Sequence, residues 1–102
     1  NAQLDRDDQL FVSIIERALK EAREMKEIKV YVSPKYHKVV TERRAELAEM
    51  FPPNIQFLIF VNEDLQDTES YIETNHGRIV VSVDEQLKEL RRQLYELIES
   101  KE

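Results

Sequence analysis

Apolar and polar residues follow two different periods along this chain, and the changes of period predict its elements. In the first segment, apolar residues recur at helical spacing with charged residues between them. These apolar positions are Leu10, Phe11, Ile14, Ile15, Ala18, Leu19, Ala22 and Met25. We therefore expect one amphipathic helix over residues 7–26, whose apolar face has to be buried against a sheet or a partner.

A strand and a second helix are expected next. Residues 27–33, EIKVYVS, alternate apolar and polar positions, which is typical of a half-buried strand. Pro34 suits the first turn of a helix, and Ser33 before it is a suitable N-cap. The apolar spacing then predicts a helix over residues 34–51, which a pair of prolines ends.

The second half of the chain predicts three strands. Residues 55–61, IQFLIFV, are nearly continuously apolar, so we expect a strand that is covered on both faces at the centre of the sheet. Residues 70–74 and 78–83 read as two further strands, joined at Asn75-His76-Gly77. Gly77 is the only glycine in the chain. Because a short hairpin turn requires positive φ, we expect Gly77 to be a structural turn residue.

Helical spacing resumes at Asp84, and we expect Asp84, or Ser82 before it, to cap this last helix. The helix continues through a stripe that we expect to pack on the core. The stripe consists of Leu87, Leu90, Leu94 and Leu97. The predicted order is therefore α-β-α-β-β-β-α. The strand–helix–strand unit over residues 28–61 requires two parallel strands, and the hairpin adds antiparallel ones. We expect an α+β fold, in which three helices pack on a mixed four-stranded sheet.

The composition limits the classes of partner. With a net charge of -6 over 102 residues, the surface repels phosphate groups, so we expect neither nucleic acid nor a membrane surface as a direct partner. The absence of cysteine excludes disulfides and thiolate chemistry, and it fits a reducing compartment. The sequence shows neither a signal peptide nor an apolar run of about 20 residues, as a membrane span would need. The chain begins with Asn, so we expect it to be part of a longer protein.

The sequence offers little with which to build a metal site. Its two histidines, His37 and His76, lie far apart, whereas a zinc site usually takes three or four ligands. An acidic loop follows residues 55–61, but it lacks the glycine that a calcium loop needs at its sharp turn. The acids of this loop are Glu63, Asp64, Asp67 and Glu69. We expect no bound metal.

Catalytic groupings are equally sparse. A single glycine cannot form a glycine-rich phosphate loop or a nucleophile elbow. Glu73 and Asp84 are the conceivable acid–base pair, but charged residues are common beside hairpins and at helix caps. We therefore expect no catalytic residue and no cofactor. A small enzyme or metal-binding domain on an unrelated scaffold is the alternative.

The stretch 71–97, YIETNHGRIVVSVDEQLKELRRQLYEL, carries a more specific pattern. An extended I-E-T leads into a turn with G-R-I, and S-V-D-x-Q-L then opens a long helix. This pattern resembles the C-terminal domain of the flagellar assembly protein H family, which includes stator proteins of type III secretion systems. The residues that fit are Ile72, Glu73, Thr74, Gly77, Arg78, Ile79, Ser82, Val83, Asp84, Gln86 and Leu87. The stretch 28–40 is also similar to that family's strand and helix start, so the resemblance covers nearly the whole chain.

Two places depart from the family's pattern. Thr68 and Glu69 stand where the family often has a Gly-Gly pair, and Val80 and Val81 stand where it has Asp-Ala. Any role that the family gives to that aspartate is therefore absent here. The peripheral-stalk E subunit of V-type and archaeal ATPases is similar as well and is the alternative, although the stretch 82–87 favours the flagellar family.

The resemblance implies a non-catalytic stator and regulator of the export ATPase of the flagellar, type III secretion apparatus. It implies that the chain binds the N-terminal segment of that ATPase at the cytoplasmic face of the basal body. It also implies a homodimer formed through a long N-terminal helical region. On this view residues 1–26 are the end of a helical stalk, and residues 27–102 are a compact α/β C-terminal domain.

The last helix has more apolar residues than one core stripe needs. Tyr95 and Ile98 lie off the stripe, with Arg91 at i−4 from Tyr95, and tyrosine and arginine are enriched at binding hot spots. The first helix has a similar excess at Leu10 and Leu19. We expect these two helices to form a groove that takes an amphipathic helix of the ATPase. The alternative is that these residues only widen the contact with the core.

Overall fold

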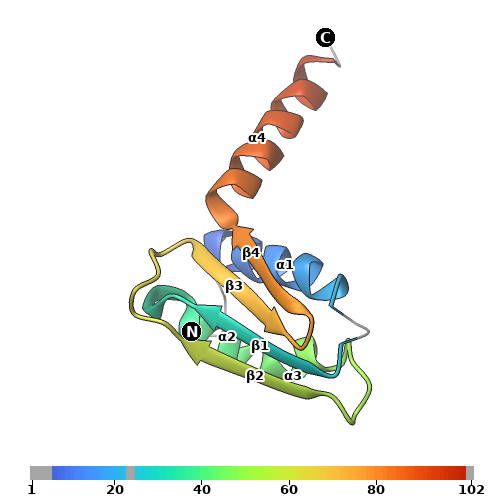
Figure 1. The fold of residues 1–102 in the computed structure, drawn as a ribbon. Helices are drawn as coiled ribbons and strands as arrows, with labels where there is room; N and C mark the ends of the chain where they lie inside the picture. The colour runs from blue at the N-terminus through green and yellow to red at the C-terminus, as the bar shows by residue number, and fades with distance from the viewer. Residues whose placement is uncertain (1–5, 23–24, 101–102) are drawn as a thin grey trace.

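A four-stranded sheet with helices on one of its faces forms the body of the protein (Figure 1). The computed structural model describes residues 6–22 and 25–100. In chain order its elements are α1 (Arg6–Lys20), β1 (Glu27–Val32), α2 (Pro34–Glu42), α3 (Arg44–Ala48), β2 (Gln56–Val61), β3 (Glu69–Thr74), β4 (Gly77–Ser82) and α4 (Val83–Glu99). The predicted α+β class and mixed sheet are confirmed, and the predicted order holds once α2 and α3 are counted as one helix.

The strand order is β2-β1-β3-β4, which makes β1 and β3 the central strands. β1 runs parallel to β2 and antiparallel to β3, and β3 pairs antiparallel with β4. The prediction that residues 55–61 lie at the centre of the sheet is wrong, because β2 lies at an edge. Its apolar run has another cause. Phe57 is buried under the helices, whereas Phe60, on the opposite face of the strand, is 39% exposed.

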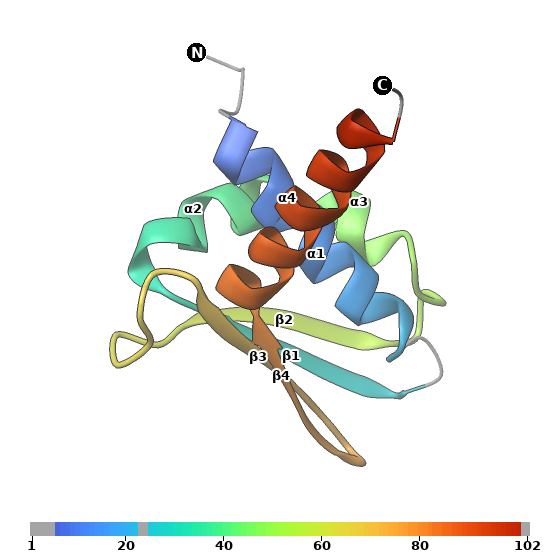
Figure 2. The same cartoon turned by 90° about the horizontal axis from the view of Figure 1, so that it is seen from above.

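The central strand β1 shows an alternating pattern because the described helices cover only one face of the sheet (Figure 2). Ile28, Val30 and Val32 of β1 are fully buried on the helix side. Lys29 and Tyr31, which alternate with them, are half-exposed on the other side. A central strand therefore keeps the period of two that is typical of one-sided burial.

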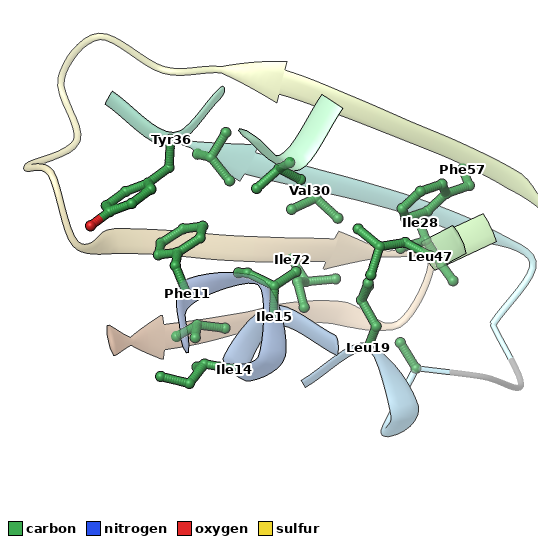
Figure 3. Close-up of a cluster of buried hydrophobic side chains, with 14 of the residues drawn as sticks. Phe11, Ile14, Ile15, Leu19, Ile28, Val30, Tyr36, Leu47, Phe57 and Ile72 are labelled. Atoms are coloured by element: carbon green, nitrogen blue, oxygen red, sulfur yellow. The ribbon is translucent and has the colours of Figure 1, made fainter. Parts of the chain in front are cut away.

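Side chains of α1 fill the space between the helices and the sheet (Figure 3). Phe11, Ile15 and Leu19 are fully buried, and the ring of Phe11 stacks on Tyr36 of α2 with 4.1 Å between the ring centroids. Each such buried side chain contributes about 1.5–3 kcal/mol to folding. Residues 6–20 are therefore part of the folded body. That residues 1–26 also end a longer helical stalk stays a prediction.

The boundaries of two predicted helices change. The helix predicted over residues 7–26 ends at Lys20 and continues as a turn through Ala22, and residues 23 and 24 lie outside the described residues. The helix predicted over residues 34–51 is divided at Arg43, which has φ −99° and ψ 10°. Both helices nevertheless bury their apolar sides against the same core.

Ser33 occupies the N-cap position of α2, as predicted, but its side chain does not cap the helix. Its hydroxyl instead donates a 2.7 Å hydrogen bond to the carbonyl oxygen of Asp67, in the loop between β2 and β3. As a cap, the hydroxyl oxygen would accept a hydrogen bond from a backbone N–H of the first helical turn, but here the hydroxyl acts as a donor in a tertiary contact instead. This bond joins two segments that are far apart in the sequence.

The β3–β4 hairpin closes through a two-residue turn, Asn75-His76, with Thr74 paired to Gly77. Neither turn residue has a positive φ, whereas Gly77 has φ +139°. Glycine is therefore needed just after the turn, at the first residue of β4. The Thr74 hydroxyl supports the turn by accepting a bond from the His76 N–H and donating one to the Gly77 carbonyl oxygen.

α4 begins directly after β4 and projects from the body (Figures 1 and 2). Leu87 packs against the core, but Leu94 and Leu97 are 59% and 60% exposed. The prediction that four leucines of this helix form one core stripe is therefore wrong. α4 contacts α1 and β3, and Leu87 near its start packs on the core, but farther along the helix Leu94 and Leu97 project away from the body (Figure 1).

Candidate protein-docking surfaces

Charged side chains along one side of α4 stabilise the helix. Arg92 forms ion pairs with Glu89 and Glu96, one turn away in either direction, and Lys88 Nζ lies 3.8 Å from Glu85 Oε1. The hydrogen bond from Arg92 holds the pKa of Glu89 below its ordinary value, and the same bond raises the pKa of Arg92. Pairs at this spacing favour the helical conformation of α4 modestly, because they are exposed to solvent.

The other side of α4 presents large apolar side chains to solvent. Tyr95 and Ile98 are 67% and 56% exposed, and they line an open hollow of about 300 Å³ together with Arg91 and Leu94. We call Arg91, Leu94, Tyr95, Leu97 and Ile98 the α4 docking face. It combines aliphatic area with a tyrosine and an arginine, the residue types that most often dominate binding energy.

The leucines of α4 recur at intervals of three, four and three residues, as do the a and d positions of a coiled coil. They are Leu87, Leu90, Leu94 and Leu97. Gln86 and Gln93, which flank this seam on one side, are uncharged. Such a surface is suited to packing against a second helix.

The predicted partner-binding residues divide into two groups. Arg91, Tyr95 and Ile98 lie together on the α4 docking face. Leu19 is fully buried in the core and is therefore removed from the set, and Leu10 is half-buried on α1. The expected groove between the first and last helices is thus not formed by these leucines.

α1 and α4 do meet, but only at the root of α4. A hollow of about 210 Å³ lies there between the two helices and β4, and its helical lining is largely polar: Arg17, Ala18, Glu21 and Gln86. β4 adds Ile79, Val80 and Val81 to the lining, but the polar side chains of the two helices make this hollow a poor groove for an amphipathic helix. The exposed side of α4 is the better candidate.

Leu94 and Leu97 were missed as surface residues because apolar spacing was interpreted as contact with the core. The heptad spacing, together with its uncharged flank, was the signal that could have identified a seam for another helix.

The uncovered face of the sheet carries a second apolar surface. The strand register places Phe60, Tyr31, Tyr71 and Val80 side by side across all four strands. The ring of Tyr31 lies 5.3 Å from that of Phe60 and 4.5 Å from that of Tyr71, while Val80 is 75% exposed. We call these four residues the aromatic row. Each strand contributes one of them, so sequence periodicity alone did not bring them together.

A charged row lies beside the aromatic row on the same face. The register aligns Leu58, Lys29, Glu73 and Arg78. Arg78 Nη2 lies 3.2 Å from Glu73 Oε2, and the guanidinium carbon lies 4.2 Å from the centroid of the Tyr71 ring. Lys29 Nζ lies 3.5 Å from Glu27 Oε1.

The described residues contain no group of three or more His, Cys, Asp or Glu side chains that could hold a metal ion. His37 lies on α2 and His76 lies at the hairpin turn, on separate parts of the fold. Within residues 6–22 and 25–100, no helix is both long enough and apolar enough to cross a membrane. The two exposed apolar surfaces are therefore the most distinctive features on which a function can be argued.

Comparison with known sequences decides the family. A sequence model of the family described as "Flagellar assembly protein FliH" matches residues 1–90. The chain belongs to the FliH family. It is also 29% identical over 94 residues to a Bacillus subtilis (strain 168) protein named "Probable flagellar assembly protein FliH". That alignment covers 92% of this chain and 45% of the relative, so the chain spans less than half of the relative's length.

The resemblance to the flagellar family in the stretch 71–97 is thereby confirmed, and membership of the FliH family supports a role in flagellar assembly. The family match takes in α1 and the whole sheet, and it ends at residue 90. All five residues of the α4 docking face lie beyond the FliH match, whereas the aromatic row lies inside it.

Proposed function

We propose that this chain is a non-catalytic flagellar assembly module that binds the export ATPase through the α4 docking face. The observation that carries the proposal is the exposed apolar side of a helix that projects from the folded body. Membership of the FliH family supplies the flagellar context. The resemblance of the sequence to ATPase stators suggests the partner.

The chemistry of the α4 docking face suggests what the ATPase contributes. A seam of leucines with an uncharged flank suits an amphipathic helix whose own apolar residues recur every three or four positions. Arg91 at the edge of the seam would pair with an acidic residue on that helix. The N-terminal segment of the ATPase is the proposed source of the helix.

The proposal also includes the rest of the assembly. The chain would act as a homodimer through a helical region that precedes α1, at the cytoplasmic face of the basal body. The Bacillus subtilis relative is long enough to contain such a region, because the alignment covers only 45% of it. Because the chain carries a net charge of -6, we propose neither nucleic acid nor an anionic membrane surface as its direct partner.

The experiment is a titration of the chain with the export ATPase of the same organism, both intact and without its first twenty or so residues. Arg91→Glu combined with Tyr95→Ala should raise the Kd roughly thirtyfold or more, which corresponds to about 2 kcal/mol or more. Leu94→Ser should weaken binding in the same way.

Glu99→Ser is the control for Leu94→Ser, because it changes an exposed position of the same helix on the side away from the leucine seam. It should bind as the parent does. Circular dichroism should report the same helix content in every variant. Full affinity in a folded Arg91→Glu, Tyr95→Ala double variant would move the ATPase site away from α4.

A further inference from the structure

We propose that the uncovered face of the sheet is an interface for a second copy of this chain, which packs its own sheet face to face against the first about a two-fold axis. This surface is separate from the α4 docking face and does not depend on the proposed ATPase partner. The inference rests on the aromatic row, on the charges beside it, and on the way a two-fold axis brings the two copies together.

The strand register of the aromatic row allows a two-fold axis to bring the row of one copy over that of a second. Consider a two-fold axis that lies between the two copies and runs parallel to the strands, midway between β1 and β3. Rotation about it places β1 of one copy over β3 of the other and β2 over β4. Tyr31 of one copy then lies over Tyr71 of the other, and Phe60 lies over Val80. Packed sheets are separated by about 10 Å, which accommodates two interdigitated layers of side chains.

The same axis makes the charges complementary. Lys29 and Glu73 stand opposite each other on β1 and β3, so the rotation places Lys29 of each copy over Glu73 of the other. Arg78 lies over the apolar Leu58 of the other copy. A two-fold axis laid across the strands over the aromatic row would instead bring Glu73 over Glu69 of the second copy, so charge favours the axis along the strands.

The charge balance of this face also suits self-association. The chain as a whole carries a net charge of -6, so two copies repel over most of their surfaces. On this face the bases Lys29 and Arg78 are paired with the acids Glu27 and Glu73, and Glu69 adds one further acid. The face is therefore closer to neutral than the chain as a whole, so two copies repel each other less here than their net charge alone would suggest.

The size of the sheet sets the expected strength. Strands of six residues span roughly 20 Å, and four strands about 4.8 Å apart span roughly 15–20 Å. The planar area of the face, which is the product of these two lengths, is small beside the roughly 1,200–2,000 Å² that stable interfaces bury in total. We therefore expect a weak, transient dimer, as is typical of interfaces below that size.

The test uses two variants of the 102-residue chain, Lys29→Glu and Glu73→Lys, studied by sedimentation equilibrium from about 10 μM to about 1 mM, a range chosen from the interface size. Each variant alone places like charges against each other twice, which should raise the dimer Kd roughly tenfold or more. An equimolar mixture restores opposite charges at both contacts. It should recover the affinity of the parent although neither chain has changed internally.

Lys38→Glu mixed with Glu42→Lys is the matched control. Both positions are exposed on α2, away from the open face, and the pair carries the same change of net charge. This mixture should associate no better than its components. Val80→Arg adds a variant whose parent side chain is 75% exposed, so its folding should be preserved while dimerisation weakens by roughly tenfold.

Three results would overturn the proposal. The first is a parent chain that remains monomeric at 1 mM. The second is self-association that persists unchanged in Lys29→Glu, Glu73→Lys and Val80→Arg. The third is a mixture that associates no better than either variant alone. Leu94→Ser should leave self-association unchanged, which separates this interface from the proposed ATPase site.

Discussion

The hydroxyl of Ser33 donates a 2.7 Å hydrogen bond to the carbonyl oxygen of Asp67 and thereby joins the end of β1 to the loop between β2 and β3. Ser33 is fully buried, whereas Asp67 is exposed, so the bond is partly buried. We expect Ser33→Ala to lower the free energy of unfolding by about 0.5–1.5 kcal/mol, the net contribution of a typical hydrogen bond. Thermal unfolding should show a fall in Tm of roughly 4–8 °C for each kcal/mol.

Ser70 provides the matched comparison. It is 2% exposed, and its Oγ has no hydrogen-bond partner among the described protein atoms. Ser70→Ala should therefore leave the Tm unchanged or raise it, because a buried unpaired hydroxyl opposes folding. Equal losses in the two alanine variants would show that the bond to Asp67 is not what matters at Ser33.

Gly77 should tolerate no side chain, for a reason that lies in the backbone. A Cβ atom added there would meet no atom within 4 Å, but φ is +139°, a conformation that other residues rarely adopt. We expect Gly77→Ala and Gly77→Val each to lower stability by about 1–3 kcal/mol in chemical denaturation. Asparagine tolerates φ near about +57° rather than +139°, so Gly77→Asn should not restore stability.

His76→Ala is the control for the hairpin, because the His76 side chain is exposed and only its backbone N–H bonds to Thr74. It should unfold at the same denaturant concentration as the parent. Loss of stability in His76→Ala but not in Gly77→Ala would contradict this account of the turn.

Leu19 and Leu97 both belong to apolar stripes of helices, but truncation to alanine should lower the free energy of unfolding strongly at one and hardly at the other. Leu19→Ala should cost about 2–5 kcal/mol, because Leu19 is fully buried and its removal leaves a cavity. Leu97→Ala should change stability by no more than about 0.5 kcal/mol, because the Leu97 side chain is 60% exposed. Urea unfolding followed by circular dichroism measures both. A large loss in Leu97→Ala would place the end of α4 against the core.

The ion pairs of α4 predict a dependence on pH. The pKa of Glu89 is lowered by its hydrogen bond from Arg92, so ionised Glu89 stabilises the helix above its ordinary pKa of about 4.3. This contribution is lost as the pH falls through the lowered value. An NMR titration should show the pKa of the Glu89 carboxyl returning toward its ordinary value in Arg92→Gln. An unchanged Glu89 pKa in that variant would show that the pair does not persist in solution.

The sequence predicted most of the elements because one-sided burial leaves a clear period. Ile28, Val30 and Val32 identify a half-buried strand wherever it lies in the sheet. The position of the strand was harder to predict. The run from Gln56 to Val61 is apolar on both faces, and periodicity cannot distinguish a strand covered on two sides from an edge strand with an exposed apolar face.

The candidate docking surface was only partly predictable for a related reason. Arg91, Tyr95 and Ile98 stood out as surplus to a core stripe, and the structure places them together in the open. Leu94 and Leu97 did not stand out in this way, because the spacing of apolar residues shows which side of a helix is apolar but not what covers that side. Whether α4 lies on the body or projects from it depends on tertiary contacts at its first turns.

The direct passage from β4 into α4 has a mechanical consequence. No loop separates Ser82 from Val83, so a force applied to α4 reaches an edge strand without slack. β4 is joined to β3 by a ladder of six residue pairs, and a pull along the strand loads the bonds of this ladder together rather than one after another. In a moving assembly, the hairpin would transmit tension from the projecting helix to the centre of the sheet, while the short turn before Gly77 keeps the two strands in register.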